Sequence, residues 1–398
     1  MITALRNIYN ESFQEKNYVQ FLEEIDAVFP GAMEFRIAET PLFINKDFKN
    51  KMLDTCEHII ENIKAESFTK KSESAIPTSL KVPGIEDHPE FIAFDFGICK
   101  NKNGELEPQL IEMQGFPTLF CYELLMDKAY RNNFKIPEGF TGFLSGYNED
   151  SYLALLKKII LNEHPAENVI LLELFPHQQK TRLDFYCTEK AIGIKTVCLT
   201  ELIKEGEDLF YLLNGNKTQI KRIYNRIIFD ELQRQDATII EKGKILFAPL
   251  NVEWCPHPNW FYRISKYTLP FLHHPNIPAT YFLNEVKQLP QDLENYVLKP
   301  LFSFAGQGVI IDIEPKDIEA INDPENWILQ KKVNYAEAIA TPDGYAKAEI
   351  RLFFFWDKNS SSPIPVYNLG RLSKGKMIGV RYNQDKTWVG GTHCYFEN

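Results

Sequence analysis

The first part of the chain alternates between helical and strand-like spacing of its hydrophobic residues. Residues 46–66 carry apolar side chains at intervals of three and four, which predicts an amphipathic helix buried on one face. Residues 91–98 and 106–114 predict two strands joined by a turn that contains Gly104. A further helix is expected at 119–130.

The next section has the order of a parallel βαβ unit. A helical pattern at 150–162 precedes the apolar run 168–174, and a second helical pattern at 178–191 precedes the run 194–202. Strand, helix and strand at this spacing predict two parallel strands with a helical connection. The unit is small and Rossmann-like, but it lacks the glycine fingerprint of a dinucleotide site.

Turn signals divide the chain into three predicted parts. Residues 132–148 are rich in Asn, Gly and Pro and mark a boundary, whereas Asn214-Gly215 predicts a hairpin. From about residue 240 onward the pattern is mostly strand-like. A chain of 398 residues is expected to contain two or three domains, at roughly 150 residues per domain. The predicted parts are 1–140, 141–240 and 241–398.

Composition narrows the class of protein. The 398 residues are 44% hydrophobic and 13% aromatic, and they carry a net charge of −10, which argues against a nucleic-acid groove. The seven cysteines are scattered without a C-x-x-C pair, which favours reduced thiols and a cytoplasmic protein. The N-terminus lacks a signal-peptide core, and no apolar run approaches the roughly 18 residues of a membrane span.

The segment 296–313 is the first candidate for ligand chemistry. Two β-prone runs flank a short loop, and Lys299 leaves the first run just before it. Glycines permit close backbone approach, successive N–H groups can bind an anion, and a lysine supplies a point charge to phosphate. An ordinary hairpin with an exposed lysine fits the segment equally well. The candidate loop residues are Ser303, Ala305, Gly306, Gln307 and Gly308.

Two strands further along carry polar side chains that fit either a nucleotide site or ordinary structure. The run 326–333 ends in Gln330 and Lys331, where a backbone could bind an adenine edge, although an ordinary strand end is the commoner explanation. In the run 345–356, Glu349 and Arg351 share one face, which is usually a surface or cross-strand pair.

A local basic cluster follows at 368–383. It contains Arg371 and Arg381, and it is either a solvated hairpin tip or a contact for phosphate or carboxylate.

Three oxygen-bearing side chains near residue 100 are the candidates for a metal site. Asp95 lies within an apolar strand, where an unpaired acid is costly and needs a partner or a cation. Glu112 and Gln114 end the next strand on one face, and pairing through the turn at Gly104 would bring Asp95 opposite Glu112. Such ligands suit Mg²⁺. Acids paired with lysines or arginines remain the alternative.

Taken together, these segments resemble the ATP-grasp superfamily and, more narrowly, its circularly permuted branch, typified by glutathionylspermidine synthetase. VLKPLFSFAGQGV resembles that family's lysine and glycine loop, WILQKKV its adenine hinge, and FIAFDFG with LIEMQGFPT its metal segment. NWFYRISKYTLPFL resembles the segment of the second nucleotide lysine, here Lys266. Gln114 and Ala93 depart from the family's usual Asn and Arg, and no amidase domain is recognisable.

The resemblance implies an α/β (α+β) fold: a circularly permuted ATP-grasp fold with a small Rossmann-like pre-ATP-grasp domain. It also implies an ATP- and Mg²⁺-dependent carboxylate–amine ligase that works through an acyl phosphate, with small-molecule or peptide substrates and no nucleic-acid or membrane partner. Lys266 and Lys299 would hold phosphates, and the 303–308 loop would cover the γ-phosphate. The other implied roles are Gln330, Lys331 and Val333 at the nucleotide, Asp95, Glu112 and Gln114 at the metal, and Arg351, Arg371 and Arg381 at the transferring group.

Two other functions remain open from the sequence. Gln114 and Ala93 also fit a catalytically silent nucleotide- or partner-binding protein on the same fold. A kinase or phosphohistidine-type transferase on the same fold is a third possibility. The lack of a histidine at a motif position counts against it.

Overall fold

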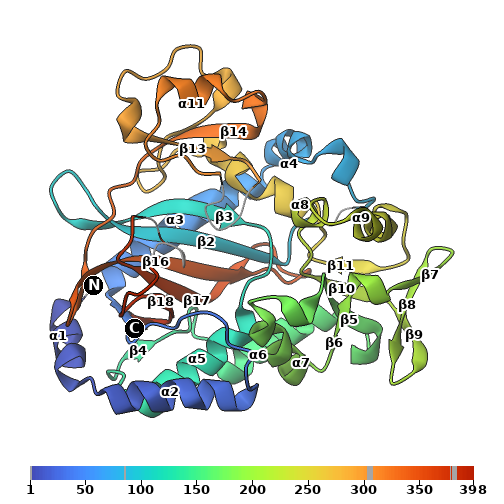
Figure 1. The fold of residues 1–398 in the computed structure, drawn as a ribbon, viewed down its shortest axis with the longest axis horizontal. Coiled ribbons are helices and arrows are strands. Elements are labelled where there is room, and N and C mark those ends of the chain that lie inside the picture. The colour runs from blue at the N-terminus through green and yellow to red at the C-terminus, as the bar shows by residue number, and fades with distance from the viewer. Residues whose placement is uncertain (1, 85–86, 303–307, 377, 379–382) are drawn as a thin grey trace.

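A long antiparallel sheet runs through the centre of the protein (Figure 1). The computed structural model describes residues 2–84, 87–302, 308–376, 378 and 383–398. The strand order is β18-β17-β16-β2-β3, and β15 pairs with β16. The sheet therefore joins strands from near residue 100 to strands from the last part of the chain. The bounds are β2 Phe91–Lys100, β3 Leu106–Gln114, β15 Ile339–Thr341, β16 Gly344–Phe355, β17 Ile364–Ser373 and β18 Gly390–Thr392.

Alternation along β16 gives the two faces of this sheet different surroundings. Ile350, Leu352 and Phe354 are buried on one face in a core that includes side chains of β2 and of helix α3 (Lys46–Lys64). Phe353 and Phe355 belong to a second core on the other face, with aromatic side chains of helix α5. Because residues two apart share a face, Glu349 and Arg351 continue this second face.

Helices cover the second face and surround the chain termini. Figure 1 shows α2 and α5 side by side below the central sheet. A three-stranded sheet of order β1-β19-β4 connects the beginning and the end of the described chain. The bounds are α1 Thr3–Ser12, α2 Glu15–Val28, β1 Leu42–Ile44, α5 Phe120–Asn133, β4 Phe140–Thr141 and β19 Cys394–Glu397.

The predicted βαβ unit is confirmed as part of a parallel sheet of order β11-β10-β5-β6. β5 (Val169–Glu173) and β6 (Lys195–Cys198) pair in parallel, and α7 (Arg182–Ile192) connects them. The predicted hairpin is also confirmed, with positive φ at Asn214 and Gly215. The division at residues 140 and 240 stays a prediction. The remaining bounds here are α6 Glu149–Leu161, β7 Ile203–Glu205, β8 Asp208–Leu213, β9 Asn216–Ile220, β10 Arg222–Asn225 and β11 Glu253–Cys255.

A small antiparallel sheet of order β12-β14-β13 lies beside the central sheet, at the top of Figure 1. Its strands β13 and β14 confirm the two apolar runs predicted near Lys299 and Gln330. The predicted second strand of the 296–313 segment, which follows the loop, is wrong in extent, because it is reduced to a single bridge. Ile310 forms an isolated bridge to Leu298, while the side chains of Val309 and Ile311 line a cavity. The bounds are β12 Thr280–Phe282, β13 Tyr296–Pro300, β14 Trp327–Lys331 and α11 Pro315–Glu319.

Short helices complete the described structure. All seven cysteines are unpaired and buried, as the sequence predicted. Among the described residues, no helix combines the length and the apolar character needed to cross a membrane. The bounds are α4 Glu66–Ser72, α8 Phe229–Leu232, α9 Ala237–Gly243 and α10 Trp260–Arg263.

Candidate functional site

A row of charged side chains crosses the central sheet. Glu112 on β3 lies opposite Asp95 on β2, and Asp95 lies opposite Arg351 on β16. In the same sheet Glu349 on β16 lies opposite Arg371 on β17. The predicted pairing of Asp95 with Glu112 is therefore confirmed. Two strand pairs that are distant in sequence, β2 with β3 and β16 with β17, bring these five groups together.

Asp95 is held by two arginines. Its side chain is only 2% exposed, Arg351 Nε lies 2.5 Å from its Oδ1 and Arg351 Nη2 lies 2.7 Å from its Oδ2, and Arg371 also pairs with Oδ2. Burial raises the pKa of this carboxyl group, but the charges and hydrogen bonds of the two arginines outweigh burial and lower it. Of the two alternatives left by the sequence, pairing with arginine is the one found.

Arg371 and Arg351 also contact groups beyond Asp95. Arg371 Nη2 lies 3.3 Å from Glu349 Oε2, and the Tyr335 hydroxyl donates to the other oxygen of Glu349. Arg351 Nη1 donates to Thr118 Oγ1 at 3.1 Å. The Glu-x-Arg pattern on β16 is therefore a cross-strand network, in which each residue finds its partner on a different neighbouring strand.

Two lysines enter from outside the central sheet. Lys266 begins a 3₁₀ turn (Lys266–Phe271), and Lys299 extends from β13. Lys299 Nζ donates to the carbonyl oxygen of Ile111 at 3.3 Å. Ile111 is the extra residue of a β-bulge in β3, because Glu112 pairs with Asp95 and Leu110 pairs with Phe96. Such a bulge leaves the backbone groups of the extra residue outside the sheet hydrogen bonds, where a side chain can bind them.

The surroundings of both lysines disfavour their charged forms. Desolvation lowers the pKa of Lys299 to about 8; the nearby charge of Lys266 adds to this, and Glu112 acts against it. Burial also lowers the pKa of Lys266, again opposed by Glu112. Burial raises the pKa of Glu349, because desolvation outweighs the attraction of Arg371. A multiply charged anion would compensate the two lysines.

These groups surround a cavity of about 370 Å³ that lies between the central sheet and the β12-β14-β13 sheet. We call it the lysine cavity. Apolar side chains of β13 and the following segments line part of it, and basic side chains line the rest, so it can hold a molecule with an apolar part and an anionic part. Its described lining residues are Ile111, Glu112, Lys266, Val297, Lys299, Val309, Ile311, Gln330, Lys331, Lys332, Val333, Asn334, Tyr335, Lys347, Glu349, Arg371, Lys376 and Ile378.

The lysine cavity brings together most of the predicted nucleotide residues that the structure describes. Arg351 and Asp95 lie in the charged row, and Gln114 lines a smaller adjoining cavity with Glu112 and Lys266. Gly308 is exposed with φ +75°, and a Cβ there would meet Pro300 Cγ at 2.9 Å, so its position requires glycine. The predicted residues Ser303, Ala305, Gly306, Gln307 and Arg381 lie outside the described residues.

Sequence reasoning missed several residues of the cavity. Lys347 stands two positions before Glu349, so alternation along the strand could have placed it on the same face. Tyr335 lies beyond the end of β14, and no local pattern indicates that it would reach Glu349. Lys332 and Lys376 were not missed, because they belong to the segments 326–333 and 368–383 that the sequence singled out; both contact Asp312, Lys332 at 3.6 Å.

The residues predicted to bind magnesium do not form a ready metal site. Both oxygens of Asp95 accept from arginines, and Gln114 Nε2 lies 3.4 Å from the Phe116 carbonyl oxygen. Within the described ranges, no group of three or more His, Cys, Asp or Glu side chains is placed to hold a metal ion. The set Asp95, Glu112 and Gln114 therefore does not fit a metal held by the protein alone.

Comparisons with known proteins point to one fold. No protein-family model matches the sequence, and no curated protein matches it. Among solved structures, the fold is similar to that of a glutathione synthetase-like effector from Globodera pallida in its apo form. The TM-score is 0.58 at 10% sequence identity, over 97% of this chain and 98% of the other. The chain therefore shares a mixed α/β fold with that effector over nearly its whole length.

Proposed function

We propose that this protein is an ATP-dependent carboxylate–amine ligase with a circularly permuted ATP-grasp fold. The observation that carries the proposal is the lysine cavity, where Lys266 and Lys299 meet Gln330, Lys331 and Val333. These residues come from separate segments that the sequence singled out for one ligand. The fold shared with a glutathione synthetase-like effector supports the same class of protein.

The lysine cavity suits both the base and the phosphates of a nucleoside triphosphate. The apolar side chains of Val297 and Val333 would pack against the base, next to the backbone of β14. Lys266 and Lys299 would then hold the phosphates, which restore the charge that desolvation disfavours in the free protein. Arg371 lies between this cavity and Asp95, so it is the described arginine best placed near the transferring group.

The reaction that we propose has two steps. A carboxylate oxygen of the acid bonds to the γ-phosphorus while the bond from that phosphorus to the β,γ-bridging oxygen breaks, which gives ADP and an acyl phosphate. The amine nitrogen then bonds to the acyl carbon, phosphate leaves, and the proton of the amine passes to solvent. The protein contributes position and positive charge, with Asp95 keeping Arg351 and Arg371 in place.

The residues predicted to bind magnesium do not fit the ion as they stand, because Asp95 is already held by Arg351 and Arg371. Mg²⁺ is usually bound by one or two carboxylates together with substrate phosphates. Glu112, which lines the lysine cavity and is partly exposed, would be the carboxylate for an ion that arrives with the nucleotide.

The arginine contacts of Asp95 favour a second candidate function. A nucleotide-binding protein without ligase activity would need the lysines but not a metal-binding carboxylate. Such a protein would bind ATP in the lysine cavity and release no ADP when acids and amines are supplied.

Calorimetry with ATP, with and without Mg²⁺, tests the proposal, and ADP release with pools of acids and amines separates the two candidates. We expect ATP to bind and Lys299→Met to weaken binding strongly. Lys316→Met is the matched control, since Lys316 is an exposed lysine paired with Glu314 on α11. Absence of ATP binding, or equal binding by Lys299→Met, would contradict both nucleotide functions.

A further inference from the structure

A second cavity lies directly beside the lysine cavity. Its volume is about 170 Å³, and it shares Arg371 with the lysine cavity. We call it the side cavity. Its walls come from helix α5, strand β17 and the segments around β18 and residue 35. They are formed largely by the apolar side chains of Phe35, Leu119, Tyr122, Leu369, Leu372 and Val389.

The lining also includes the polar residues Arg36, Glu123, Arg371 and Asn383, and of these Glu123 is a fully buried carboxyl group. Glu123 lines the side cavity, its side chain has no exposed area, and its Oε1 has no hydrogen-bond partner among the described residues. Its Oε2 lies 3.3 Å from Nδ1 of the buried His393. Burial raises the pKa of Glu123 well above its usual value; Asp184 and Asp127 raise it further, and Arg351 opposes them. A protonated carboxyl group offers one O–H donor and does not repel an anion.

Arg371 provides a cationic donor at the junction of the two cavities. Its Nη2 is engaged by Asp95 and Glu349, whereas its Nε has no hydrogen-bond partner among the described residues. A buried N–H of a guanidinium group without a partner is costly, and a carboxylate is the anion that such a donor fits well. The two unsatisfied groups, Glu123 Oε1 and Arg371 Nε, therefore both belong to residues that line the same small apolar space.

Building on the ligase function, we propose that the side cavity binds the acid substrate, and that this acid is a small monocarboxylic acid with an apolar body. Arg371 Nε donates to its carboxylate, Glu123 provides a second hydrogen bond, and the apolar walls hold its body. An apolar cavity of about 150 Å³ accommodates benzene, so the side cavity sets the size of the body at about six carbon atoms. The carboxylate would then lie beside the cavity that we assign to the nucleotide.

Binding of phenylacetate to the full chain tests this pocket without requiring turnover. We expect saturable binding by calorimetry in the absence of ATP. Phenylacetamide has the same shape without the charge, and we expect it to bind about tenfold more weakly, because it loses a charge-assisted hydrogen bond. Glutamate carries two further charged groups, an ammonium and a second carboxylate, which the largely apolar walls do not accommodate, so we expect it not to compete.

Substitutions at two positions locate the bound acid. A Cβ at Gly391, which lines the side cavity, would meet only Arg36 O at 3.9 Å, so Gly391→Val fills the space without a close contact at its Cβ. We expect Gly391→Val to abolish phenylacetate binding and to leave ATP binding unchanged, with Gly391→Ala intermediate. Glu123→Leu keeps a similar volume but removes the hydrogen-bonding group, and we expect it to weaken phenylacetate binding about tenfold.

The outcomes separate this pocket from the nucleotide function. Absence of saturable phenylacetate binding, binding no stronger than that of phenylacetamide, or equal binding by Gly391→Val would overturn the acid pocket. If the wild-type protein does not bind ATP, the ligase function is overturned even if phenylacetate binds. Thermal unfolding shows whether Gly391→Val is folded; if it is not, unchanged phenylacetate binding by Glu123→Leu overturns the pocket.

Discussion

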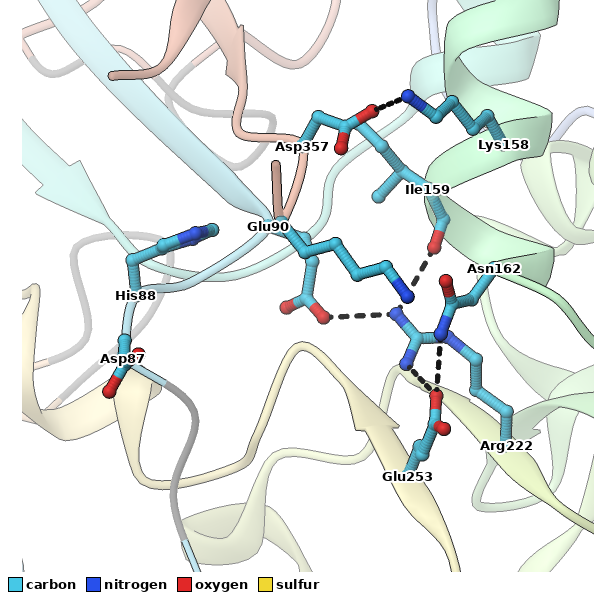
Figure 2. Close-up of a pocket in the computed structure, with 10 residues that line it drawn as sticks. Asp87, His88, Glu90, Lys158, Ile159, Asn162, Arg222, Glu253 and Asp357 are labelled. Atoms are coloured by element: carbon cyan, nitrogen blue, oxygen red, sulfur yellow. Dashed lines mark hydrogen bonds and ion pairs between the residues drawn. The ribbon is translucent and has the colours of Figure 1, made fainter. Parts of the chain in front are cut away.

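Two charged cavities of this protein use their charges in opposite ways. The first is the lysine cavity. The second lies at the start of β2, holds about 280 Å³, and is named here the Arg222 pocket (Figure 2). Its described lining side chains are Asp87, His88, Glu90, Lys158, Ile159, Asn162, Arg222, Glu253, Asp357 and Lys358.

Basic groups of the Arg222 pocket are satisfied by the protein itself. Figure 2 shows the Arg222 guanidinium between Glu90 and Glu253, at 3.1 and 2.8 Å. Its Nε donates to the carbonyl oxygen of Ile160, and its Nη2 also donates to that of Ile159. Lys158 pairs with Asp357. Such a saturated set stabilises the junction of β2, α6 and β10 and leaves Arg222 little capacity for a ligand.

The lysine cavity has the opposite balance. Its described lining includes seven lysine or arginine side chains and two acids, whereas the Arg222 pocket has three basic and four acidic side chains. Desolvation lowers the pKa values of Lys266 and Lys299, and Arg371 Nε has no partner within the described structure. The comparison indicates that local charge, rather than the acidic charge of the whole chain, distinguishes the cavity for which we propose an anionic ligand.

The largest expected effect is on stability in the Arg222 pocket. Arg222→Met should lower the free energy of unfolding by about 3–5 kcal/mol, because it removes the Arg222 cation from the buried Glu90; the loss at Glu253, which is 42% exposed, is smaller. Chemical denaturation measures this change. ATP affinity of the folded protein should stay within about twofold, and a large loss of affinity would show that the two cavities are not independent.

Lys299→Met should show the reverse behaviour. We expect ATP affinity to fall by roughly 30- to 150-fold, since one charged hydrogen bond is worth about 2–3 kcal/mol, while stability is unchanged or increased. Calorimetry and denaturation on the same preparation measure both quantities. A stability loss as large as that of Arg222→Met would mean that Lys299 is a structural cation as well.

A smaller effect is expected from pH. The pKa of Lys299 is lowered to about 8. At a pH below this value Lys299 is charged and can attract phosphate, and at a higher pH the ammonium group loses its proton. ATP affinity should therefore fall about tenfold between pH 7 and pH 9 if the charged form alone binds. Lys299→Arg keeps its charge throughout this range and should remove most of the dependence. An identical pH profile for both proteins would assign the effect to another group.

The smallest effect should come from the edge of the Arg222 pocket. Lys158 is 60% exposed at its side chain, so removing its ion pair with Asp357 by Lys158→Ala should cost less than about 1 kcal/mol of stability. Denaturation at low and high salt would measure it. A larger loss would indicate that the pocket acts as one network instead of a buried arginine with an exposed neighbour.

Local pattern predicted the strands of the site well. The alternation around Asp95 and Glu112, with the turn at Gly104 between them, was enough to predict their pairing. The apolar run before Gln330 likewise predicted β14. The pairing of Asp95 with Glu112 and the strand before Gln330 depend on residues close in sequence, within one hairpin or one strand. The spacing of apolar residues indicates such local structure directly.

Contacts between distant segments could not be predicted in the same way. Nothing in the sequence around Asp95 indicates that β16 lies beside β2 and brings Arg351 to it. The run after Gly308 looked like a strand because it is β-prone, yet only Ile310 finds a backbone partner, at Leu298. Propensity describes a segment alone, whereas a strand requires a paired neighbour along its length.

The central sheet also has a consequence for how the protein is made. β2 and β3 leave the ribosome early, but β16 and β17, which complete their sheet, are translated much later, and β1 waits for β19. Until then the edge of β2 that pairs with β16 has no partner, so the nascent chain would depend on chaperones or transient contacts during translation. Such long-range pairing also predicts slow refolding from denaturant compared with a helical protein of similar size.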